Sequence, residues 1–237
     1  MKELRQFTTA RVGLGRAGNS VPTREMLDFQ LAHARARDAV HFPLDSNGLR
    51  REMEADGWTA AVVKSAARDR AEYLRRPDLG RCLDIDSRGR LDALSGNPDS
   101  VFVIADGLSA LAVHRHALAL LQATDGAIGS QVVIVEQGRV AIGDEIGEIL
   151  RASLVVVLIG ERPGLSSPDS LGVYLTWNPR VGKIDAERNC ISNIRSDGLS
   201  PVAAGVLLAM LMRESRARRL SGISLRVPGP LELKSAE

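Results

Sequence analysis

The sequence predicts an α/β protein, in which an N-terminal helical region precedes a Rossmann-like, mainly parallel sheet domain with helices on both faces. Three observations lead to this prediction. After residue 97, short apolar stretches alternate with segments of helical periodicity, which is typical of a parallel sheet covered on both sides. Before residue 97, apolar side chains such as Leu27 and Leu31 recur at helical spacing. The 237 residues, 44% of them hydrophobic, suffice for one large or two modest domains.

Residues 1–97 are expected to form the N-terminal helical domain. Three helices are expected there, over residues 22–40, 48–56 and 66–76. Pro22 suits a first helical turn, where its missing N–H donor costs little, and Pro77 ends the third helix. Residues 83–97 are rich in Asp, Gly, Ser and Arg and are expected to be a loop. The domain boundary is therefore placed at Asn97–Pro98.

Residues 98–237 are expected to form the Rossmann-like domain. The apolar stretches predict strands over residues 101–105, 132–136, 154–159 and 172–177. Helices are expected over residues 110–123, 143–152 and 201–220. Ser109 and Ser200 are suitable N-cap residues for the first and last of these helices. Only the tail, Pro228 to Glu237, is expected to be loose.

A candidate binding site follows the third apolar strand. This strand stops at Gly160-Glu161-Arg162-Pro163-Gly164, and in open parallel sheets ligands bind beyond the carboxyl ends of the strands. A second polar cluster, residues 185–193, surrounds Cys190 and is expected to be a loop. The rim formed by these two segments is the best candidate site, although composition and spacing do not identify its ligand.

Two other motifs have competing interpretations. Gly13 to Gly18 matches G-x-G-x-x-G, but no buried strand is expected before it, so a glycine turn is favoured over a dinucleotide site. Asp106-Gly107 follows the first strand and either faces a ligand or forms a turn that caps the next helix. The residues alone leave both readings of Asp106 open.

Composition limits the classes of function. The net charge is +2 and aromatic residues make up 3%, which disfavours nucleic-acid binding. Cys82 and Cys190 are too few for a disulfide framework or a Cys-based zinc site, and no metal ligand set is expected. No apolar run approaches the length of a membrane span. A soluble, cytoplasmic protein is therefore expected.

Four long motifs resemble the small (light) subunit of ethanolamine ammonia-lyase. The resemblance runs from about Thr9 to Val227, and its motifs are ARVGLGRAGNSVPTREMLDFQLAHARARDAV, FVIADGLSALAVHRHA, LIGERPGLSSPDSLGVYLTW and DAERNCISNIR. It implies an adenosylcobalamin-dependent lyase that converts ethanolamine to acetaldehyde and ammonia by radical chemistry. It further implies a hetero-oligomer in which a large subunit is catalytic, while the small subunit closes over the cofactor.

The resemblance also implies three cofactor-binding residues, Val140, Glu161 and Cys190, and no catalytic residue in this chain. A carboxylate such as Glu161 accepts hydrogen bonds from the side amides of a corrin ring. Val140 offers an apolar wall, and Cys190 is a small side chain that packs closely. Without the resemblance, the residues alone favour a strand-core role for Val140 and a buried apolar role for Cys190.

Two alternative functions remain, a free-standing Rossmann-like nucleotide-dependent enzyme and a structural interaction subunit. The location implied by the resemblance is the cytoplasm, or a bacterial microcompartment within it. Relatives often carry a longer N-terminal extension that is associated with packaging into such compartments. Because this sequence starts close to its first family motif, targeting of this chain to such a compartment is disfavoured.

Overall fold

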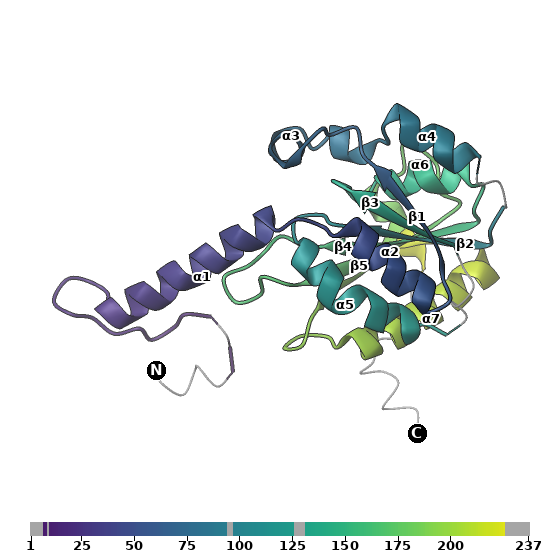
Figure 1. Cartoon of the computed structure of the whole chain (residues 1–237). Coiled ribbons are helices and arrows are strands. Elements are labelled where there is room, and N and C mark those ends of the chain that lie inside the picture. Colours follow the sequence, from purple (N-terminus) through teal and green to yellow (C-terminus); the bar gives the residue numbers. More distant parts are fainter. Residues whose placement is uncertain (1–6, 9, 94–96, 126–130, 226–237) are drawn as a thin grey trace, which may run out of the picture.

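The computed structural model describes residues 7–8, 10–93, 97–125 and 131–225, and it places a six-stranded sheet at the centre (Figure 1). The strands are β1 (Thr59–Lys64), β2 (Ser100–Ala105), β3 (Gln131–Glu136), β4 (Leu154–Gly160), β5 (Leu171–Trp177) and β6 (Arg188–Ile194). Their order is β1-β3-β2-β4-β5-β6. The first four strands are mutually parallel, whereas β5 runs antiparallel to both β4 and β6. The predicted mainly parallel α/β sheet is confirmed.

Helices cover both faces of the sheet, as predicted (Figure 1). One face is covered by α2 (Ser46–Ala55), α5 (Ala110–Gln122) and α7 (Pro201–Arg218), and the other by α4 (Ile85–Asp92) and α6 (Ile142–Ile149). Along β2, Phe102 and Ile104 face the first group, while Val101 and Val103 face the second. Because successive strand side chains point to opposite faces, a fully apolar strand forms two cores at once.

The helix α1 (Thr23–His41) projects from the body of the molecule (Figure 1). Only Ala32 and Ala39 of this helix are buried. Its base is tied down by Arg70, the first residue of α3 (Arg70–Arg75), whose Nε donates to the carbonyl of Val40 at 2.7 Å. Three short 3₁₀ helices, Leu79–Arg81, Asp185–Glu187 and Gly222–Ser224, complete the described secondary structure.

Two capping predictions are confirmed. The side chain of Ser109 accepts a hydrogen bond from the amide of Ala112 at 3.3 Å, and that of Ser200 accepts from Ala203 at 3.2 Å. Each hydroxyl thereby satisfies one of the amides that a first helical turn leaves without a partner.

Several element predictions are wrong. The expected helical region contains β1, which pairs with β3 along its full length. The expected loop at residues 83–97 contains α4, the third expected helix shortens to α3, and Cys190 lies in β6 rather than in a loop. The domain boundary at Asn97–Pro98 stays a prediction. The expected loose tail, residues 228–237, lies outside the described residues.

Residues 10–12, which the structure describes directly before the G-x-G-x-x-G segment, form no strand. Gly13, Gly15 and Gly18 all have positive φ angles and lie in a loop that precedes α1, away from the sheet (Figure 1). A dinucleotide site requires a strand directly before this motif and a helix that opens within it. The glycine-turn interpretation therefore holds. Within the described part of the chain, no helix has the length and apolar character needed to cross a membrane.

Candidate functional site

The predicted rim lies at the carboxyl edge of the parallel strands. Glu161 directly follows β4, and Asp106 directly follows β2 at the same edge. The turn that follows β3 brings Val140 to this edge as well, immediately before α6. Strands of one direction end on one side of the sheet, so the fold gathers polar groups from distant parts of the sequence.

Glu161 is half-buried and one of its carboxylate oxygens is held firmly. Its Oε2 accepts from the Ser170 hydroxyl at 2.5 Å and from the Asn193 amide at 3.3 Å. Its own amide donates to the Ser170 carbonyl at 2.9 Å. Among the described residues, no hydrogen-bond donor reaches Oε1. The carboxylate is thus fixed by one oxygen and keeps the other available as an acceptor.

Gly172 lets this carboxylate lie over the sheet. A Cβ atom at residue 172 would stand 3.0 Å from Oε1 and 3.2 Å from Cγ of Glu161, closer than ordinary van der Waals contact. Residue 172 lies on the same face of β5 as Tyr174, two positions further on. Glu161 therefore folds back onto the face that carries Tyr174.

Cys190 lies directly opposite Tyr174 in the β5–β6 pair, so the two side chains are neighbours on one face of the sheet. Burial, together with the neighbouring Cys190 and Glu161, raises the pKa of Tyr174 to about 12. Cys190 is exposed as a residue, yet enough protein surrounds its thiol for desolvation to raise its pKa, against the opposing effect of Tyr174. Both groups are neutral at neutral pH, beside one carboxylate.

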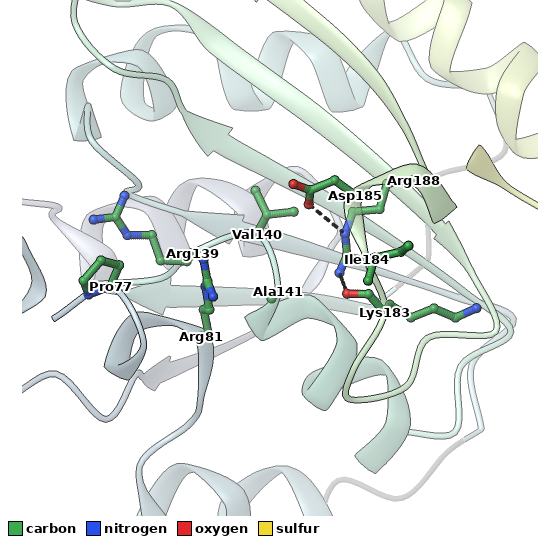
Figure 2. Close-up of a pocket in the computed structure, with 9 residues that line it drawn as sticks. All are labelled: Pro77, Arg81, Arg139, Val140, Ala141, Lys183, Ile184, Asp185 and Arg188. Atoms are coloured by element: carbon green, nitrogen blue, oxygen red, sulfur yellow. Dashed lines mark hydrogen bonds and ion pairs between the residues drawn. The ribbon is translucent and has the colours of Figure 1, made fainter. Parts of the chain in front are cut away.

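A pocket of about 430 Å³ lies next to this surface and contains Val140 (Figure 2). Its lining residues are Pro77, Arg81, Arg139, Val140, Ala141, Lys183, Ile184, Asp185 and Arg188. Val140 is half-buried and packs against the same core as Tyr174. Asp185 lines the pocket and its charge also acts on Tyr174, so the pocket and the Glu161 surface are neighbours.

The floor of the pocket is held by a buried ion pair between β6 and α6. Two guanidinium nitrogens of Arg188 each contact one carboxylate oxygen of Asp144 at 2.6 Å, and both side chains are only 2% exposed. Arg188 also donates to the Thr176 hydroxyl at 3.0 Å and to the Lys183 carbonyl at 2.9 Å. This bidentate geometry fixes the position of the guanidinium.

The structure brings two of the three predicted residues, Glu161 and Cys190, to one surface, and it places Val140 in the adjoining pocket. Four residues that shape the surface or pocket were not predicted: Ser170, Gly172, Tyr174 and Arg188. For Gly172 and Tyr174 a signal was present, because the alternation of β5 places both on one face. Ser170 and Arg188 act through contacts that their local sequence does not indicate.

Comparison with known proteins identifies the family. The family model described as ethanolamine ammonia-lyase light chain matches residues 1–226. Proteins named "Ethanolamine ammonia-lyase small subunit" from Pseudomonas fluorescens (strain SBW25) and Xanthomonas campestris (strain B100) are 55% and 54% identical to it, over 94% of this chain and 84% and 86% of theirs. One of the same name from Ralstonia nicotianae is 53% identical, over 98% of this chain and 90% of its own. This chain therefore belongs to the ethanolamine ammonia-lyase small subunit family, and is a subunit of a lyase.

Proposed function

We propose that this chain forms one wall of an adenosylcobalamin cleft, whose other wall is the large subunit of ethanolamine ammonia-lyase. The observation that carries the proposal is the carboxylate of Glu161, which is anchored through Oε2 and open at Oε1. The side amides of a corrin ring are hydrogen-bond donors, and a fixed carboxylate is a strong acceptor for them.

The surroundings of Glu161 support the same ligand. Tyr174 and Cys190 add a neutral, partly apolar surface on the same face of the sheet. Val140 adds an apolar wall at the entrance to the adjoining pocket. A large, flat ring with polar amides at its edge suits a surface of this kind, because apolar contact and peripheral hydrogen bonds are both available.

When bound, adenosylcobalamin supplies the radical that initiates the reaction, and the large subunit binds ethanolamine. The role proposed for this chain is to bind and orient the cofactor and to keep water away from it, since exclusion of water prevents side reactions of reactive intermediates. The chain alone is expected to show no turnover. The proposed location is the cytoplasm, or a bacterial microcompartment within it.

The test is the variant Glu161→Gln in the complex of both subunits. Loss of the charged acceptor is expected to raise the Kd for cobalamin about tenfold, while the KM for ethanolamine stays unchanged. Cobalamin absorbance during titration measures the Kd. The matched control is Glu52→Gln, an exposed carboxylate on α2, across the sheet from the site.

Two results would contradict the proposal. An unchanged Kd in Glu161→Gln would remove this residue from the cleft. A wild-type complex that assembles but binds no cobalamin would favour the alternative function, a subunit that only contacts another chain.

A further inference from the structure

The pocket beside Val140 is rich in positive charge. Four of its lining side chains are cationic, namely Arg81, Arg139, Lys183 and Arg188. Arg188 is neutralised by Asp144, and the Nζ of Lys183 lies 2.7 Å from a carboxylate oxygen of Glu187. The remaining two, Arg81 and Arg139, have no carboxylate within ion-pair distance among the residues that the structure describes.

Two guanidinium N–H groups that line this pocket are buried without a hydrogen-bond acceptor. They are the Nε groups of Arg139 and Arg188. The nearest carboxylate oxygen of Asp185 stands 3.8 Å from Nε of Arg188, which is beyond hydrogen-bond length. Buried donors are nearly always paired in folded proteins, so these two groups leave unused donor capacity beside the pocket.

Local packing holds Arg139 in place for such a ligand. Its guanidinium lies over the ring of Tyr73, 4.2 Å from the ring centroid, and its Nη2 donates to the Tyr73 carbonyl at 3.4 Å. Figure 2 shows Arg81 and Arg139 on one side of Val140, and Asp185 and Arg188 on the other. The Asp185 side chain is fully exposed, so solvent screens its repulsion of an anion.

We propose that this pocket binds the phosphodiester in the nucleotide tail of cobalamin, an inference that rests on the proposed function. The corrin side chains are neutral amides, whereas the phosphodiester carries a negative charge. Arg81 and Arg139 supply the opposite charge, and the buried Arg188 fixes the wall beside them. Arginine suits phosphate oxygens because its planar donors are charged and directional.

The test compares two corrinoids, cobalamin and cobinamide, which lacks the phosphodiester, the sugar and the base. Each is titrated into the complex of both subunits and its Kd is measured by absorbance. Arg81→Gln is expected to raise the Kd for cobalamin about fivefold and to change the Kd for cobinamide less than about twofold, because only cobalamin carries the anion. Arg81 is exposed, so its replacement leaves the fold intact.

Arg139→Gln is expected to act in the same selective way, and Arg81→Lys is expected to restore part of the cobalamin affinity because it restores the charge. The control is Arg213→Gln, which removes an exposed charge from α7 on the opposite face of the sheet and should change neither Kd.

The inference is overturned if Arg81→Gln and Arg139→Gln both leave the cobalamin Kd unchanged. It is also overturned if both variants raise the Kd for cobalamin and the Kd for cobinamide equally. Failure of the proposed function looks different, because the wild-type complex would then bind neither corrinoid. Glu161→Gln distinguishes the Glu161 surface from the pocket. Because it removes an acceptor for the corrin amides, it should raise the Kd for both corrinoids.

Discussion

Asp106 is a buried carboxylate that holds neighbouring elements together, and the helix that follows it is capped by Ser109 rather than by Asp106. Its Oδ1 accepts from the Gly138 amide at 3.0 Å, and its Oδ2 lies 3.1 Å from Nη1 of Arg70. Because Arg70 also bonds Val40, this carboxylate links β2, the turn after β3 and the base of α1.

Asp106 makes the stability of the fold depend on pH. Burial raises its pKa to about 6, against the opposing effects of Arg70 and backbone amides. The folded state therefore binds the proton more tightly than the unfolded state, whose ordinary pKa is 3.8, and stability falls as the pH rises from 4 through 6. The loss is about 3 kcal/mol, at 1.36 kcal/mol per pKa unit.

Asp106→Asn is thus expected to flatten the dependence of the unfolding free energy on pH between about 4 and 6. Urea unfolding at several pH values measures it, with the exposed Asp28→Asn as the control. A slope that persists in Asp106→Asn would assign the dependence to another group.

At the scale of elements, the ion pair between Arg188 and Asp144 joins β6 to α6. Arg188→Met would leave the Asp144 carboxylate buried without its partner. We expect a loss of about 3–5 kcal/mol in the free energy of unfolding, whereas the double variant with Asp144→Leu should recover most of it. Urea denaturation of the two single variants and the double variant measures the coupling. Additive losses would show that the pair does not act as a unit.

The elements that the sequence predicts best are those with the strongest apolar signal. β2 and β4 are buried along their entire length, so every residue in them is constrained to be apolar or small. β1 was missed because two of its six residues, Ala60 and Ala61, carry little hydrophobic signal. α4 was missed because Gly89 and several charged residues interrupt the helical spacing of its apolar residues. Asp84 nevertheless caps this helix, since its side chain accepts a hydrogen bond from the Ser87 amide.

At the scale of the whole molecule, α1 contributes little to the stability of the core. Leu27 and Leu31 are 58% and 50% exposed, whereas Leu208 of α7 is fully buried. Leu27→Ala and Leu31→Ala are each expected to change the free energy of unfolding by less than about 0.5 kcal/mol, while Leu208→Ala should cost about 2–5 kcal/mol. Chemical denaturation measures all three. A loss above about 1 kcal/mol for either α1 variant would mean that the helix packs on the body.

The candidate site could be predicted only in part, because it depends on contacts across the whole chain. Glu161 is recognisable from its place after an apolar strand, and Cys190 and Val140 from the resemblance to the family. The pocket instead joins residues 77–81, 139–141 and 183–188, which nothing in the local sequence connects. Its shape depends on the order of the strands and on the buried pair of Arg188, and both arise only once the sheet has assembled.

The direction of β5 has a consequence for which positions of this protein can vary in sequence. Crossover connections join the strands β1 to β4, and each of these connections places a helix against a face of the sheet. β5 and β6 each run antiparallel to the preceding strand. The connections that lead into them therefore contain no α-helix to cover the face that carries Tyr174. Substitutions at Tyr174 or Cys190 should therefore disturb little helix packing, so these two positions can vary together with the surface that covers them, whereas Arg188, on the same strand as Cys190, stays constrained by its ion pair with Asp144.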